Sequence, residues 1–168
     1  MLKEEAIAAE IPPLRRYARA LVGNISDADD LVQDALERAL DRIGLWKEGE
    51  SPRRWLFTIM HNIHIDRMRE RARRPFHTEL TPELADPAAR GVDNVTSHEI
   101  SAALQALPEE QRHVVLLVGM EGMSYKETAA ILDIPIGTVM SRLARGRDRL
   151  KDLIGSETGR TPAIRRIK

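Results

Sequence analysis

The chain has 168 residues and carries 26 basic and 26 acidic side chains, so its formal net charge of zero predicts no particular partner. It has no cysteine, which excludes disulfides and thiolate metal sites and fits a protein of the reducing cytoplasm. Its apolar runs are too short to cross a bilayer and its amino end lacks a signal-peptide core, so no membrane insertion is expected. Because apolar residues recur at helical spacing, we predict an all-α fold of two small domains joined by a flexible linker.

The first pronounced helical pattern follows Pro12-Pro13 and ends at Gly23-Asn24, where a glycine followed by an asparagine suits a left-handed helix terminus. A second helix is predicted to begin at Ser26, which forms a variant of the capping box with Asp29 three residues later. Aspartates in its first turn suit the positive end of the helix dipole. Its apolar pattern extends to about Ile43.

The side of this second helix that lies opposite its apolar stripe is acidic. DNA would repel such a surface, so the helix is not expected to contact nucleic acid. An acidic face is most often simply solvated, and the functional alternative is a docking surface for a basic protein partner. This side is predicted to carry Asp30, Asp34, Glu37 and Asp41 with Gln33 at its edge, and the predicted docking residues are Asp30, Gln33, Asp34 and Glu37.

A third long helix is predicted from Ser51-Pro52, a cap followed by a first-turn proline, to about Arg74. Between Ser51 and Pro75 seven arginines oppose two acids, a local charge of +5. Arginine attracts phosphate, while amide and aromatic side chains bond to exposed bases or stack on them. The side chains that could contact nucleic acid here are Phe57, His61, Asn62, Arg67 and Arg69.

Three of these side chains also have simpler interpretations. Phe57 could pack against the first helix, and Asn62 could merely hydrogen-bond a neighbouring turn. His61 and His64 could form a metal pair, but neither a thiol nor a clear third ligand accompanies them in the sequence. We therefore predict no metal site and no cofactor.

Pro75 to Val95 contains three prolines and a glycine and has no helical period, so it is predicted to be a linker. Acidic residues outnumber basic ones here, which leaves the tether either solvated or suited to a positive channel of a large partner. Glu99 to Leu107 is predicted to be a short helix, and Pro108 starts the next one. The predicted division is a first domain at 1–75, an acidic linker at 76–97, a second domain at 98–154 and a mobile tail at 155–168.

The stretch from Ser124 to Leu150 is typical of a helix-turn-helix. Ser124 and Glu127 have the spacing of a capping box at the start of its first helix. Asp133-Ile134-Pro135 should end that helix, because the residue before a proline is disfavoured in helical geometry. The second helix is predicted to begin near Gly137-Thr138.

The second helix of this pair is basic and has two distinct sides. Between Pro135 and Lys151 four arginines and one lysine oppose one aspartate, a local charge of +4. A lone basic helix is more often a solvated surface helix. Here the cap, the proline turn and the separated faces favour insertion into a major groove, where arginine bonds to guanine. The core side is predicted to carry Val139, Leu143, Gly146 and Leu150. The opposite side is predicted to carry Ser141, Ala144, Arg145 and Asp148, and the predicted DNA contacts of this helix are Thr138, Ser141, Arg142 and Arg145.

Three segments together resemble the bacterial extracytoplasmic-function (group four) sigma factors. They are DADDLVQDALERAL, SPRRWLFTIMHNIHIDRMRERARR and ALPEEQRHVVLLVGMEGMSYKETAAILDIPIGTVMSRLARGRDRL, which lie between about Glu10 and Ile154. The order and spacing of these segments make the resemblance specific.

The resemblance implies a subunit that binds core RNA polymerase and gives it promoter specificity. It implies that the acidic face docks on the clamp helices of the largest catalytic subunit, through Asp30, Gln33, Asp34 and Glu37. It implies that the long basic helix contacts the promoter's minus-ten element through His61, Asn62, Arg67 and Arg69. It implies that the last helix contacts the minus-thirty-five element through Thr138, Ser141, Arg142 and Arg145.

The segment LVGMEGMSYKE resembles the general-stress subgroup, which implies an anti-sigma factor as a further partner. The family often has arginine where this chain has Met140, so the preferred promoter sequence is expected to differ.

The competing hypothesis is a sigma-like decoy that sequesters the anti-sigma protein without binding DNA. An ordinary repressor would leave the acidic helix unexplained, and no nucleophile-base pair or phosphate loop indicates an enzyme.

Overall fold

The computed structural model describes residues 2–74 and 94–157, and neither range contains a β-strand. We call residues 2–74 the N-terminal half and residues 94–157 the C-terminal half. None of the helices in these ranges combines the length and the apolar character that a membrane crossing requires. The elements are α1 Lys3–Ala9, α2 Ile11–Val22, α3 Ile25–Asp41, η1 Ile43–Leu45, α4 Pro52–Arg73, α5 Asn94–Ala106, α6 Glu109–Val115, the π-helical turn η3 Leu116–Met120, α7 Tyr125–Leu132 and α8 Ile136–Glu157.

The turn between α2 and α3 differs from the predicted one by a single capping residue. Gly23 ends α2 in the left-handed conformation with φ +79°, as expected. Asn24 rather than Ser26 then caps α3, because its side-chain oxygen accepts a hydrogen bond of 3.1 Å from the backbone N–H of Asp27. The predicted cap at Ser26 is therefore wrong, and α3 begins at Ile25.

Three other boundaries differ from the sequence analysis. The short helix α1 was not predicted, although Ala6 and Ile7 bury its inner side. α5 begins at Asn94, inside the predicted linker, and α8 continues to Glu157, past the predicted start of the tail. The rest of the predicted linker and tail lies outside the described residues.

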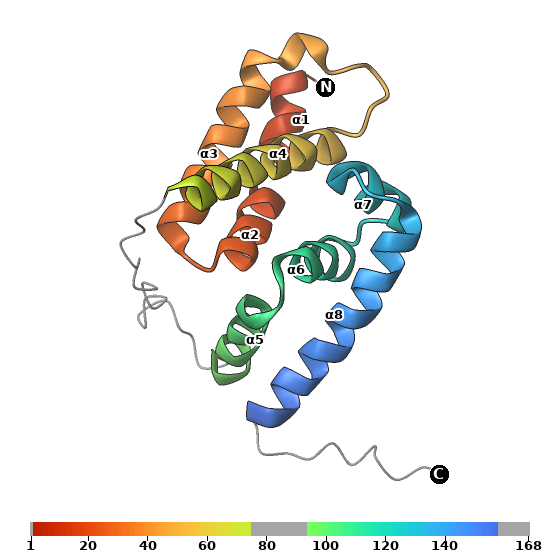
Figure 1. Cartoon of the computed structure of the whole chain (residues 1–168). Coiled ribbons are helices and arrows are strands. Elements are labelled where there is room, and N and C mark those ends of the chain that lie inside the picture. The colour runs from red at the N-terminus through yellow and green to blue at the C-terminus, as the bar shows by residue number, and fades with distance from the viewer. Residues whose placement is uncertain (1, 75–93, 158–168) are drawn as a thin grey trace.

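In the N-terminal half, α2, α3 and α4 pack around a shared apolar core (Figure 1). Leu14, Leu31 and Leu56 contribute one wholly or almost wholly buried side chain from each helix. Tyr17 and Phe57 meet edge to face with their ring centroids 5.2 Å apart. This packing fixes the directions in which α3 and α4 present their polar sides.

In the C-terminal half, α6 packs against the long helix α8, which also contacts α5 and α7 (Figure 1). The predicted core side of α8 is buried at Val139, Leu143 and Gly146. Gly146 allows the closest approach, because a Cβ atom at this position would lie 2.7 Å from a methyl group of Val115. The buried apolar residues of both halves form one continuous cluster, so the two halves pack on each other.

We expect Gly146→Ala to lower the free energy of unfolding by about 1 to 2 kcal/mol. Overpacking against Val115 costs roughly 1 to 3 kcal/mol, and the gain in helix propensity from glycine to alanine offsets up to about 1 kcal/mol of that cost. Gly137→Ala is the matched control, since it adds the same methyl group to the same helix where no atom lies within 4 Å. Urea unfolding followed by circular dichroism measures both, and a Gly146 variant as stable as the control would contradict the close packing.

Candidate nucleic-acid and polymerase interfaces

The turn between α7 and α8 has the geometry of a helix-turn-helix. The Ser124 hydroxyl accepts a 3.0 Å hydrogen bond from the backbone N–H of Glu127, and the Glu127 carboxylate accepts one of 2.8 Å from the N–H of Ser124. This reciprocal pair is the predicted capping box. Asp133 ends α7 in the left-handed conformation with φ 54°, and Pro135 precedes α8. The amino end of α8 is thereby held at the surface.

The predicted DNA side of α8 is largely available to solvent. Ser141 and Arg145 are exposed, while Thr138 is half-buried. The Ser141 hydroxyl donates a 3.1 Å hydrogen bond to the Thr138 carbonyl, which leaves the Ser141 oxygen free to accept another. Arg142 is half-buried and lies 3.7 Å from the Glu110 carboxylate. Of the two arginines of α8 predicted to contact DNA, Arg145 is therefore the better placed.

The predicted acidic side of α3 is also exposed. Asp30, Gln33, Asp34 and Glu37 all lie outside the core, and the Gln33 amide donates a 3.2 Å hydrogen bond to Glu37. Asp34 forms an ion pair with Arg67 of α4. Asp34 is exposed and Arg67 is half-buried, so the pair lies at the surface, adds little stability and is open to exchange with a partner. The acidic face thus adjoins the basic helix without being covered by it.

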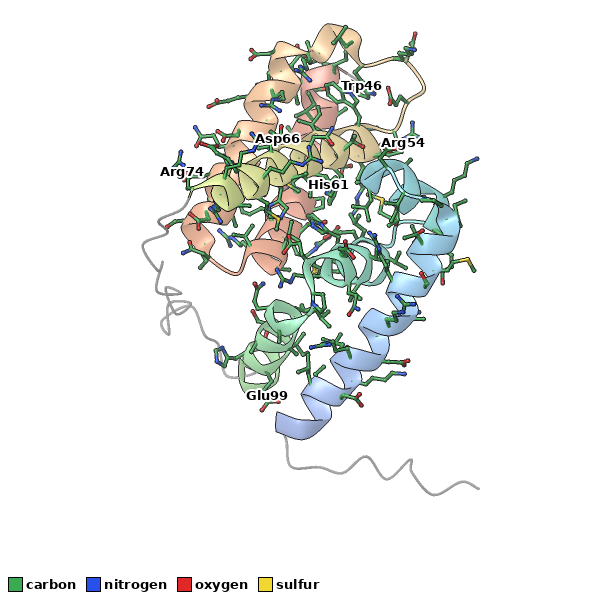
Figure 2. All side chains as sticks on the ribbon, in the orientation of Figure 1. Trp46, Arg54, His61, Asp66, Arg74 and Glu99 are labelled. Carbon is green, nitrogen blue, oxygen red and sulfur yellow. The ribbon has the colours of Figure 1, made fainter. Side chains whose placement is uncertain are left out.

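Three of the predicted minus-ten residues of α4 line a cleft beside the C-terminal half. Asn62 and Arg69 are exposed, and they line a cleft of about 610 Å³ together with His61 of the same helix and Arg142 of α8. Figure 2 shows His61 on the side of α4 that faces the C-terminal half, and its ring centroid lies 5.0 Å from that of His113. The cleft brings residues predicted for two separate promoter elements to one place.

Phe57 is not available to stack on bases. Its side chain is 1 % exposed and packs on Tyr17, so its proposed contact with nucleic acid is wrong and the packing interpretation is confirmed. The guanidinium of Arg53 covers the outer face of the ring at 5.8 Å from its centroid. Phe57 therefore supports the core and not the DNA surface.

A buried carboxylate that the sequence analysis missed joins the two halves. Glu121 follows η3, and its side chain is fully buried. It accepts hydrogen bonds of 3.0 and 2.8 Å from the Arg16 guanidinium of α2 and forms a second ion pair with Arg53 of α4. Because Arg16 and Arg53 lie 105 and 68 residues from Glu121 in the sequence, only the tertiary structure brings the three together.

Arg112 forms a second connection between the halves. Its guanidinium donates to the carbonyls of Leu104, Gln105 and Leu107 at 2.7 to 2.9 Å and to the carbonyl of Leu21 in the N-terminal half at 3.1 Å. One side chain thus satisfies carbonyl groups around the end of α5 and also reaches across to the end of α2. Gln105 reinforces this contact by donating a 2.8 Å hydrogen bond to the Ala20 carbonyl.

Three histidines and a carboxylate occupy the centre of the contact between the halves. Burial, together with the nearby His113 and His64 rings, lowers the pKa of His61 to about 3. Burial also lowers the pKa of His113 from its ordinary value. Burial alone would raise the pKa of Glu109, but the adjacent His113 and His64 more than offset it and hold that pKa well below its usual range.

The two halves match two different family descriptions. Residues 7–61 match the Sigma2 domain of PhyR, and residues 97–150 match Sigma-70, region 4. The chain is 38% identical over 157 residues to the ECF RNA polymerase sigma factor EcfG of Rhodopseudomonas palustris (strain TIE-1), which covers 91% of this chain and 84% of that protein. The chain belongs to the ECF RNA polymerase sigma factors. The resemblance seen in the sequence and the all-α, two-domain fold are both confirmed.

The fold of this sigma factor is similar to that of RpoE in the co-crystal structure of RpoE with the anti-sigma factor NepR from Bartonella quintana. The TM-score is 0.78 at 32% identity, over 90% of this chain and 95% of that chain. The anti-anti-sigma factor PhyR, solved in complex with NepR from Bartonella quintana, has a TM-score of 0.61 at 19% identity. That likeness covers 89% of this chain and 49% of the PhyR chain, and it concerns the fold alone.

We expect Glu121→Gln to lower the free energy of unfolding of the sigma factor by about 1.5 to 3 kcal/mol, the range for hydrogen bonds to a charged group. The substitution keeps the side-chain shape and removes the charge that holds Arg16 and Arg53. The loss is limited because both arginines are partly exposed and regain water.

The matched control is Asp29→Asn, which neutralises the exposed pair between Asp29 and Arg19. A surface pair of this kind contributes less than about 1 kcal/mol. Thermal and urea unfolding of both variants gives the comparison. An effect of Glu121→Gln no larger than that of the control would mean that the buried ion pair does not hold the halves together in solution.

Proposed function

We propose that this sigma factor docks on core RNA polymerase through the acidic face of α3 and reads the promoter with two basic helices. α4 contacts the minus-ten element and α8 contacts the minus-thirty-five element. The observation that supports this division is the separation of charge onto different exposed helix faces, with Asp30 and Asp34 on α3 and Ser141 and Arg145 on α8. Polymerase binding and DNA binding then use surfaces that do not compete.

This function requires the two halves to move apart. Elements named minus ten and minus thirty-five lie about 25 base pairs from each other, which is roughly 85 Å of B-form DNA. In the structure α4 contacts α7 directly, and Asn62 and Arg142 line the same cleft. The arrangement described here is therefore that of the free protein, and polymerase stabilises a more open one.

We propose further that the protein acts in the cytoplasm, in a stress response, and is held inactive by an anti-sigma factor. RpoE, which resembles it in sequence and fold, was solved with the anti-sigma factor NepR. No residue is assigned a catalytic role and no cofactor is required, because specificity comes from contacts with DNA and polymerase.

The alternative is a decoy that sequesters an anti-sigma factor without binding DNA. One observation favours it. Residues 7–61 match the Sigma2 domain of PhyR, and a protein named PhyR is an anti-anti-sigma factor. A decoy has no need of a DNA-reading side on α8. The exposed Ser141 and Arg145 on a capped helix-turn-helix therefore favour the promoter reader.

Arg145→Ala separates the two functions. A promoter reader should lose about 1 to 3 kcal/mol of binding to its preferred sequence, or roughly 5- to 150-fold. Run-off transcription with core polymerase on that promoter and on promoters with single substitutions in the minus-thirty-five element measures the loss.

Arg147→Ala is the control, since it removes the same charge from an exposed position of the same helix one turn beyond the buried Leu143. It should lower binding to all sequences slightly and equally. Unchanged promoter preference in Arg145→Ala would favour the decoy.

Asp34→Arg should weaken binding to core polymerase by reversing a charge on the docking face. The fold should be retained, because Asp34 is exposed and its pair with Arg67 is worth less than about 1 kcal/mol. Pull-down of core polymerase and circular dichroism give the two measurements. Glu4→Arg makes the same charge reversal on the exposed side of α1 and should leave polymerase binding intact. Equal weakening by both would show a general effect of charge instead of docking by α3.

A further inference from the structure

We propose that a divalent transition-metal ion such as Zn²⁺ binds between the two halves of the chain, at His64 of α4 and Glu109 and His113 of α6. The sequence offers His64 without a convincing third ligand. The fold supplies two more ligands from the other half of the chain, and this inference does not depend on the proposed function.

The three side chains place their ligand atoms around a common point. One ring nitrogen or carboxylate oxygen from each lies within 4.8 Å of the others. The His64 Nε2 atom is 2.6 Å and the His113 Nε2 atom 3.1 Å from the Glu109 Oε1 atom. Ligands of tetrahedral Zn²⁺ at about 2.1 Å lie roughly 3.4 Å apart, so changes of no more than about 1.4 Å in these separations would admit the ion.

His113 provides the observation that most favours a ligand at this point. It is 4 % exposed, and its buried Nε2 atom has no hydrogen-bond partner among the described residues. That nitrogen lies close to the Glu109 carboxylate without the alignment of a hydrogen bond. A buried polar atom left unsatisfied destabilises the fold, and coordination to a metal ion would satisfy it.

Neighbouring groups already hold the ligands as a metal site requires. The Tyr17 hydroxyl lies 3.2 Å from Nδ1 of His113, which fixes the ring and leaves Nε2 for the metal. The Arg112 guanidinium donates a 3.0 Å hydrogen bond to Oε2 of Glu109, which leaves Oε1 for the metal. Glu109 and His113 are four residues apart on α6 and so share one face of that helix.

The chemistry of the ligands selects the class of metal. Two imidazoles and one carboxylate suit Zn²⁺ and other late divalent transition metals, whereas Mg²⁺ and Ca²⁺ prefer sites made of oxygen ligands. The fourth position of a tetrahedral ion is open to water. His61 stands beside the site with its ring 5.0 Å from that of His113, and its Nδ1 atom is also buried and without a hydrogen-bond partner among the described residues.

A metal ion at this point would connect the halves directly, because His64 belongs to the N-terminal half and the other two ligands to the C-terminal half. Binding would stabilise the packed arrangement and oppose separation of the halves. For the proposed sigma function, this makes metal availability a control on how readily the chain opens.

The test uses the full chain without an affinity tag, treated with EDTA and dialysed. Titration with Zn²⁺ by calorimetry should show one saturable site, and Co²⁺ should produce the visible absorption of a tetrahedral site. His64→Gln and Glu109→Gln should each weaken Zn²⁺ binding at least tenfold. Saturating Zn²⁺ should raise the melting temperature of the unmodified protein and not that of His64→Gln.

The matched control is His98→Gln, which removes an exposed histidine of α5 and should leave Zn²⁺ binding unchanged. His64 is chosen over the deeply buried His113 so that the variant keeps its fold, which circular dichroism verifies. Absence of saturable binding, or equal binding by His64→Gln and the unmodified protein, would overturn the proposal. Equal losses in His64→Gln and His98→Gln would assign the metal to surface histidines and also overturn it. No polymerase or DNA is present, so the outcome is independent of the transcription experiments.

Discussion

The arrangement of the two halves depends on one buried carboxylate. Removing a carboxylate from water costs several kcal/mol unless cations and hydrogen-bond donors replace the water. Glu121 meets this requirement only when Arg16 of α2 and Arg53 of α4 reach it from the other half. The same contact places α2 and α4 against the region after η3 and brings the histidines of α4 next to α6.

Alongside the continuous apolar cluster, the contact between the halves includes polar groups, and these bear on the opening that the proposed function requires. The groups that meet across the halves include Glu121, Arg112 and Gln105, each held by hydrogen bonds. Water or a charged partner can replace such bonds at modest net cost, since a hydrogen bond contributes only about 1 kcal/mol on balance. Under the proposed function, a partner that binds an open form more tightly would shift the population toward that form.

The sequence pattern predicts those features that depend only on residues a few positions apart in one helix. The capping box at Ser124 and the buried side of α8 follow from spacing along one helix, and both are present. The cap of α3 was misplaced because Asn24 and Ser26 are both good caps, and the left-handed Gly23 decides between them by turning the chain directly into Asn24. Phe57 was misjudged because α4 is covered by α2 as well as α3, which buries a second flank that its own periodicity does not show.

The contacts between the halves could not be predicted, because their members are far apart in the chain. Glu109 and His64 are separated by 45 residues, and Glu121 and Arg16 by 105. These contacts between the halves affect the predicted DNA-binding residues and the acidic face differently. It brings Asn62 and Arg142 to one cleft, while the acidic face of α3 stays exposed. If α3 is the docking surface, polymerase can bind the closed protein first, and the energy of further contacts can then separate the halves for DNA.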